Sequence, residues 1–225
     1  MQSITGFGFA MLAAPFVALV APQMMPGPLL VLTLALTLGY AFRNLSHVAW
    51  ADVGYILLGR LPLSALAAVT VAWLNPDLTG LIFGLFMCVS VVLSRRKVTV
   101  ETTPLRLVIA GGLSGFFGTI TSVAAPPLAI AYQSKPADIL RASLAVNIVI
   151  GTGFSLIALN SAGVIDWADL LRQCAFCLPA LVCGSWLGAK ALKRYGQCDI
   201  RGAVLALAGL ASFGLVLRSA AALLG

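Results

Sequence analysis

Long apolar runs, joined by short polar links, make up nearly the whole chain. A helix of about 20 apolar residues crosses the roughly 30 Å hydrocarbon core of a bilayer, and most of the runs approach or reach that length. The pattern therefore predicts an all-α polytopic membrane protein. The runs cover residues 4–21, 29–42, 53–74, 78–94, 105–133, 142–160, 170–189 and 202–223.

Two of these runs contain residues that disfavour a helix. The run 105–133 is too long for one simple span, and its middle, residues 111–127, reads GGLSGFFGTITSVAAPP. Glycine costs about 1 kcal/mol and proline about 3 kcal/mol relative to alanine inside a helix. A broken helix at membrane depth is tolerated only where protein or a water-filled cavity surrounds it. We therefore predict broken or re-entrant helices at 4–21 and 105–133.

The two halves of the chain resemble each other. The tripeptide Trp50-Ala-Asp52 recurs as Trp167-Ala-Asp169, and Leu61-Pro62 recurs at the same spacing as Leu178-Pro179. Matching order and boundaries indicate an internal repeat. The predicted organisation is a first transmembrane repeat at 1–97, a polar connecting loop at 98–104 and a second transmembrane repeat at 105–225.

Composition supports a membrane protein. The chain has 225 residues, of which 60% are hydrophobic and only 9% charged, whereas soluble domains carry roughly 25% charged residues. Its net charge is +7, but the basic residues lie in short links, where membrane anchoring explains them better than nucleic acid does. The start of the chain shows no basic segment followed by a cleavage pattern, so we expect no signal peptide.

The positions of the basic residues predict an orientation. If 105–133 enters and leaves on one side as a re-entrant hairpin, all the basic links fall on the same side, as the positive-inside rule requires. The two Trp-Ala-Asp motifs then lie on opposite sides, so the repeats are inverted in topology, as in many secondary transporters. The basic residues of these links are Arg43, Arg95, Arg96, Lys97, Lys135, Arg141, Lys190, Lys193, Arg194 and Arg201.

The glycines and hydroxyls of the two interrupted runs are candidates for binding an anion. The N-terminus of a half-helix offers free N–H groups and partial positive charge, glycine lets a ligand approach the backbone, and hydroxyls add neutral donors. Alternatively, the glycines permit close helix packing and the hydroxyls bond to backbone carbonyls. The candidates are Gln2, Thr5, Gly6 and Gly8 in the first half and Ser114, Gly115, Gly118, Thr119, Thr121 and Ser122 in the second.

Four further residues are candidates for the same site. Phe116 would wall the cavity or simply pack, and Pro126 would open a second half-helix, where its missing N–H does no harm. Arg60 lies within an apolar run, where a charge is a functional candidate by default; it would attract an anion, pair with Asp52 or extend to the interface. Asn147 would complete the site or form a bond between helices.

The remaining polar residues suggest neither an enzyme nor a metal site. Asp52 and Asp169 stand at expected helix starts, where capping explains them better than proton coupling. Cys174 and Cys177 form a CxxC within an apolar run, and the single histidine, His47, is far away, so we interpret the cysteines as packing residues. We find no nucleophile with a base and no phosphate-binding loop, and we expect no cofactor.

Two stretches of the chain resemble the motifs of the TauE/SafE family of sulfite and organosulfonate exporters. They are Gln2-Ser-Ile-Thr-Gly-Phe-Gly-Phe9 with Pro15, and Gly115-Phe-Phe-Gly118 followed by Pro126-Pro127. Family members usually carry more apolar residues before the first motif. The resemblance covers essentially the whole chain and implies a multi-pass protein of the bacterial or archaeal inner membrane that moves small sulfur-containing or organic anions.

We therefore predict a secondary transporter that exports a small anion such as sulfite or an organosulfonate, by alternating access around paired broken helices. The alternatives are an uptake permease for another organic anion or sulfur compound, and a non-transporting accessory protein of the membrane. The expected partners are the anion and membrane lipid, with no nucleic acid; a homodimer is one candidate assembly.

Overall fold

The computed structural model describes residues 8–21, 25–95, 101–177 and 197–224. Within these ranges the chain is helical and contains no β-strand, which confirms the all-α prediction. Residues 167–177 are also helical. The elements are α2 (Gly8–Val20), α3 (Gly27–Arg43), the 3₁₀ turn η2 (Leu45–His47), α4 (Trp50–Trp73), α5 (Pro76–Arg95), α6 (Pro104–Thr121), α7 (Ala125–Ala131), α8 (Ala137–Ser161) and α10 (Gln197–Leu224).

Three of the described helices, α4, α6 and α8, are long and apolar enough to cross a membrane. In α4, a tryptophan stands at each end: Trp50 is 57% exposed and Trp73 is 86% exposed. Tryptophan concentrates where the bilayer meets water, and a helix of 24 residues is about 36 Å long. An exposed tryptophan therefore stands at each end of this candidate span, and Arg60 lies near its middle.

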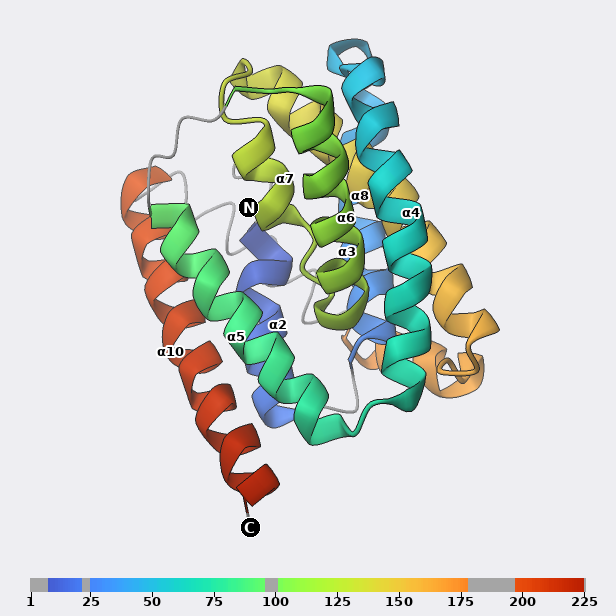
Figure 1. Cartoon of the computed structure of the whole chain (residues 1–225), viewed down its shortest axis with the longest axis vertical. Helices are drawn as coiled ribbons and strands as arrows, with labels where there is room; N and C mark the ends of the chain where they lie inside the picture. Colours follow the sequence, from blue (N-terminus) through green and yellow to red (C-terminus); the bar gives the residue numbers. More distant parts are fainter. Residues whose placement is uncertain (1–7, 22–24, 96–100, 178–196, 225) are drawn as a thin grey trace.

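The helices form two groups (Figure 1). In one, α5 and α10 pack on each other and on α2 around Ala14, Phe83, Met87 and Leu215. In the other, α4 packs on α6 and α8, and α3 packs on α8. Helices α3 and α5 run upward in Figure 1, whereas α8 and α10 run downward; α2 likewise runs opposite to α7.

Glycines bring α4 and α6 together backbone to backbone. A Cβ added at Gly59 would overlap the carbonyl of Val108, and one added at Gly111 would overlap the carbonyl of Ile56. Small residues at a membrane helix interface allow this close approach. As a result, the inner face of α4, which carries Arg60, is pressed against α6.

An arginine also links two helices of the group formed by α2, α5 and α10. Arg218 of α10 donates a hydrogen bond of 2.6 Å from Nη1 to the carbonyl oxygen of Leu19, near the end of α2. Carbonyls of the last helical turn have no partner within the helix, and a cation there also complements the helix dipole. Arg218 therefore joins α10 to the end of α2.

Within the run 4–21, where a broken helix was predicted, the described part is continuous: α2 runs through Pro15 from Gly8 to Val20. Proline is tolerated in membrane helices because neighbouring groups and local adjustments satisfy the carbonyl that it frees. Gln2, Thr5 and Gly6 lie outside the described residues.

Candidate functional site

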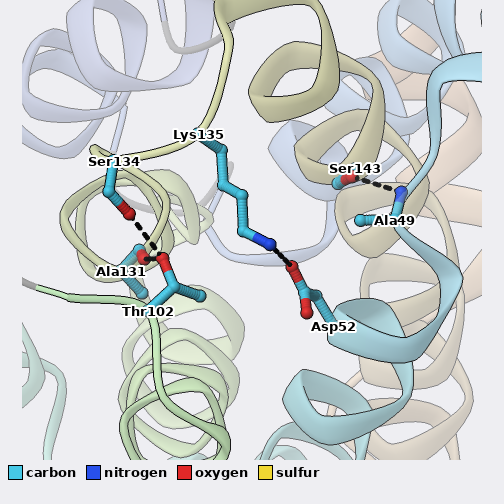
Figure 2. Close-up of polar contacts among 7 residues, drawn as sticks. All are labelled: Ala49, Asp52, Thr102, Ala131, Ser134, Lys135 and Ser143. Atoms are coloured by element: carbon cyan, nitrogen blue, oxygen red, sulfur yellow. Dashed lines mark hydrogen bonds and ion pairs between the residues drawn. The ribbon is translucent and has the colours of Figure 1, made fainter.

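The run 105–133 consists of two helices that form a hairpin. Helix α6 runs down from Pro104, the chain turns at residues 122–124, and α7 returns toward the end from which α6 came (Figure 1). The two ends of the hairpin meet, because Thr102 Oγ1 donates to the Ala131 carbonyl at 2.9 Å and lies 2.8 Å from Ser134 Oγ (Figure 2). The segment therefore begins and ends at the same end of the molecule.

Hydroxyl groups hold the turn of this hairpin. Ser122 caps α6 with a φ of 60°, a left-handed conformation that is uncommon for residues other than glycine. Its Oγ donates to the Pro26 carbonyl at 3.0 Å, and Ser114 Oγ donates to the Ala124 carbonyl at 2.7 Å. Thr121 Oγ1 donates to the Phe117 carbonyl at 2.7 Å and accepts from Val123 N at 3.1 Å. In this conformation, these hydroxyls stabilise the backbone.

The other predicted residues of the hairpin also lie near the turn or on α6. A Cβ at Gly118 would come within 2.8 Å of Ala124 Cβ, so this glycine lets the turn fold back on α6. Pro126 stands at the start of α7. Phe116 packs edge-on against Phe117, which in turn stacks on Phe86 of α5 with 4.1 Å between ring centroids.

A buried polar cluster lies beside α6, between α4 and α8. At its centre is Arg60, whose exposed fraction is only 1%. Its Nη1 donates to the carbonyl oxygen of Asn147 at 2.7 Å, and Asn147 Nδ2 donates to the carbonyl oxygen of Ser143 at 3.0 Å. The first bond holds the guanidinium against α8, and the second turns the Asn147 amide back onto its own helix.

Small residues make room for Arg60. A Cβ added at Gly151 would overlap the guanidinium, and one added at Gly115 would overlap the Arg60 carbonyl and come within 2.9 Å of Ser64 Oγ. One turn below, Thr119 Oγ1 lies 2.7 Å from Ser155 Oγ, which is also buried. The cluster therefore depends on glycines at the positions that touch the arginine.

Three buried polar atoms of this cluster have no hydrogen-bond partner: Arg60 Nε, Ser64 Oγ and Asn147 Oδ1. Among the described residues, no carboxylate forms an ion pair with Arg60. Asp52, one expected partner, instead lies 3.0 Å from Lys135 Nζ (Figure 2). The cluster thus combines an unbalanced positive charge with unused donors and one unused acceptor, which is suited to a small anionic ligand.

The structure brings together Arg60, Gly115, Thr119 and Asn147 from the predicted set. It adds residues that the sequence interpretation missed. A signal for them was present, because the residues follow four-residue steps that place them on one face of each helix. The three series are Ile56, Arg60 and Ser64 on α4, Gly111, Gly115 and Thr119 on α6, and Ser143, Asn147, Gly151 and Ser155 on α8.

Cys174, the first cysteine of the CxxC, contacts α3. Cys174 and Cys177 are both free thiols, and Cys174 Sγ lies 3.8 Å from the carbonyl oxygen of Pro28. In the part of the chain that the structure describes, no group of three or more histidine, cysteine or acidic residues is placed to hold a metal. The contact of Cys174 with α3 agrees with a packing role.

A comparison with protein-family models matches residues 1–215 to the family described as sulfite exporter TauE/SafE. Comparisons with curated proteins and with solved structures gave no match. The matched segment includes the hairpin, the buried cluster and most of α10.

Proposed function

The chain belongs to the sulfite exporter TauE/SafE family of membrane transporters, and from that membership we propose that it exports a small anion, sulfite or an organosulfonate, across the inner membrane as a multi-pass secondary transporter. A family of transporters also agrees with the expectation that the chain is not an enzyme.

The observation that carries this proposal is the buried Arg60. An ionised side chain removed from water costs several kcal/mol unless a partner of opposite charge compensates it. Arg60 is 1% exposed near the middle of a candidate membrane span and forms no ion pair with a described carboxylate. Intramembrane charges of this kind mark ion and substrate pathways. The transported anion would supply the missing negative charge.

The arrangement of the helices supports alternating access between inverted halves. We take α3 and α8, and likewise α5 and α10, as equivalent helices of the two halves. The members of each pair contact each other and run in opposite directions (Figure 1). Trp50 and Trp167, which are equivalent in the repeat, each begin a helical segment. In this mechanism the α6–α7 hairpin is re-entrant, and its movement against α4 exposes Arg60 to one side and then the other.

The hydroxyls at the hairpin turn have a defined part in this mechanism. Ser114, Thr121 and Ser122 donate to backbone carbonyls in the described conformation. We expect some of these bonds to be exchanged for bonds to the anion when the hairpin moves. Gln2, Thr5, Gly6 and Gly8 would make the equivalent contribution from the first half.

Counterflow into proteoliposomes tests the proposal. The purified protein is reconstituted, loaded with unlabelled anion and offered radiolabelled sulfite, sulfate, thiosulfate or taurine, with empty liposomes as the control. We expect saturable uptake of at least one of these anions, and the same vesicles under an imposed gradient distinguish export from uptake. Folded, oriented protein that moves none of them would contradict the transport proposal and favour the accessory alternative.

A further inference from the structure

We infer that the Arg60 cluster binds an oxyanion that carries one negative charge and one hydrogen-bond donor, bisulfite being the simplest example, and that it discriminates against dianions such as sulfate. The inference rests on the proposed function in that it takes this cluster as the anion site. It goes further because it fixes the charge and protonation of the ligand.

The charge of the ligand follows from the number of positively charged side chains in the cluster. Among the described residues, Arg60 is the one ionisable side chain of the cluster, and the other members are neutral: Ser64, Thr119, Asn147 and Ser155. One guanidinium balances one negative charge. A second negative charge would be buried without compensation, at a cost that hydroxyl donors alone do not offset.

The need for a hydrogen-bond donor on the ligand follows from the buried polar atoms that have no partner. Arg60 Nε and Ser64 Oγ are donors without partners, and both are aimed into packed protein rather than solvent. Asn147 Oδ1 is an acceptor without a partner, and its identity as oxygen is consistent with the bond from Nδ2 to the Ser143 carbonyl. A carbonyl oxygen repels a fully deprotonated anion but accepts from an O–H or N–H group, so a protonated oxyanion satisfies all three atoms.

The residues that carry the unpartnered atoms belong to α4 and α8, two helices that meet at Arg60. Arg60 and Ser64 are four residues apart on α4, so their side chains lie on the same face. Gly115 of α6 lies against the Arg60 carbonyl and Ser64 Oγ, and the backbone carbonyl of Asn147 on α8 accepts from Arg60 Nη1. Glycines at positions 115 and 151 therefore let α6 and α8 approach the residues that carry these atoms.

The test is a binding measurement on the purified protein in detergent, at constant ionic strength. The probes are sulfite, methanesulfonate and sulfate, each at a mildly acidic and a mildly alkaline pH, with calorimetry as the readout. Lowering the pH converts sulfite to bisulfite but leaves the charges of the other two probes unchanged. We expect bisulfite to bind most tightly, methanesulfonate less tightly, and sulfate at least about tenfold more weakly than bisulfite.

Three variants assign the effect to the cluster. Arg60→Gln should abolish binding, and Arg60→Lys should keep the preference for a monoanion with weaker binding. Asn147→Leu should remove the advantage of bisulfite over methanesulfonate. Arg43→Gln is the matched control, because Arg43 is exposed at the end of α3, and it should bind like the wild type.

Ser64→Ala keeps the test decisive if the arginine variants fail to fold. It removes a buried hydroxyl that has no partner, so the free protein should be at least as heat-stable as the wild type while bisulfite binds about tenfold more weakly. Unchanged binding in Ser64→Ala, or sulfate binding as tightly as bisulfite, would overturn the inference.

The two proposals fail in different ways. Binding in the expected order without counterflow in proteoliposomes would contradict transport and leave the inference standing. Counterflow that accepts sulfate as readily as bisulfite would contradict the inference and leave transport standing. Absence of both binding and counterflow would contradict both.

Discussion

At the scale of single residues, glycine decides how Arg60 is buried. Gly151 has no side chain where the guanidinium lies, and Gly115 has none where α4 approaches α6. Both are helical positions where glycine has an intrinsic cost relative to alanine. That cost is offset here by the space that the missing side chains provide for a charged group.

Two neighbouring glycines of α8 give a matched pair of substitutions. Gly151→Ala should destabilise the protein by about 1–3 kcal/mol, because the new Cβ overlaps the Arg60 guanidinium. Gly153→Ala should be neutral or stabilise it by up to about 1 kcal/mol, because nothing lies within 4 Å of the new Cβ and alanine favours a helix. Thermal unfolding in detergent measures both, and equal effects would contradict the assigned contact.

The sequence was sufficient to single out Arg60 and Asn147, because a polar residue within an apolar run is conspicuous. It was not sufficient to assign the glycines. Gly115 was expected to admit a ligand, but the space beside it is occupied by the backbone of α4. A sequence reveals where a side chain is missing, whereas the occupant of the space depends on how helices far apart in the chain pack.

At the scale of elements, the α6–α7 hairpin combines a rigid frame with a turn held by side-chain bonds. Its open ends are tied by Thr102, and its turn is tied to the start of α3 by Ser122. The pair formed by Asp52 and Lys135 adds a link from the α7–α8 connection to the first turn of α4. The hairpin is thereby connected to both neighbouring helices.

Substitutions at Ser122 separate the contribution of its side-chain hydrogen bond from that of its left-handed backbone conformation. Ser122→Ala loses the bond to the Pro26 carbonyl and keeps a Cβ in the left-handed conformation, so we expect a loss of about 1 kcal/mol. Ser122→Gly loses the same bond but adopts a φ of 60° without the cost of about 1–2 kcal/mol that a Cβ imposes. Unfolding experiments should therefore find Ser122→Gly the more stable variant; the reverse order would contradict the assigned backbone conformation.

The element boundaries were largely predictable from the apolar runs. The runs 29–42 and 53–74 correspond to α3 and α4, and 105–133 contains α6 and α7. The broken helix predicted at 4–21 is not seen at Pro15, which lies inside α2, and stays a prediction for the residues before Gly8. Proline lowers the intrinsic stability of a helix, but packing against α10 and α5 is a tertiary effect that the local sequence does not encode.

At the scale of the whole molecule, the helix ends gather at two opposite ends (Figure 1). The ends of α3 and α5 and the starts of α6 and α8 lie at the upper end in Figure 1, together with the loop that carries Lys135. The starts of α5 and of the helical segment 167–177 lie at the lower end. The positive-inside rule would assign the upper end to the cytoplasm.

Cysteine accessibility tests this orientation. Pro76→Cys and Asp166→Cys should both react with a membrane-impermeant maleimide in intact cells, because both positions belong to the lower end. Gln133→Cys, an exposed position on the α7–α8 connection, should react only after the membrane is permeabilised. Labelling of positions 76 and 166 from opposite sides would contradict both the hairpin topology and the inverted repeats.

The two tryptophans at the ends of α4 also define a length. They stand at the two ends of about 36 Å of helix, and we expect them to hold Arg60 at a set depth in the bilayer. A thinner bilayer would make α4 tilt or would draw a tryptophan out of its interface, and either change would shift the arginine relative to the midplane. The acyl-chain length of the surrounding lipid thus becomes a control on transport, with a maximum rate expected where the bilayer matches the spacing of Trp50 and Trp73.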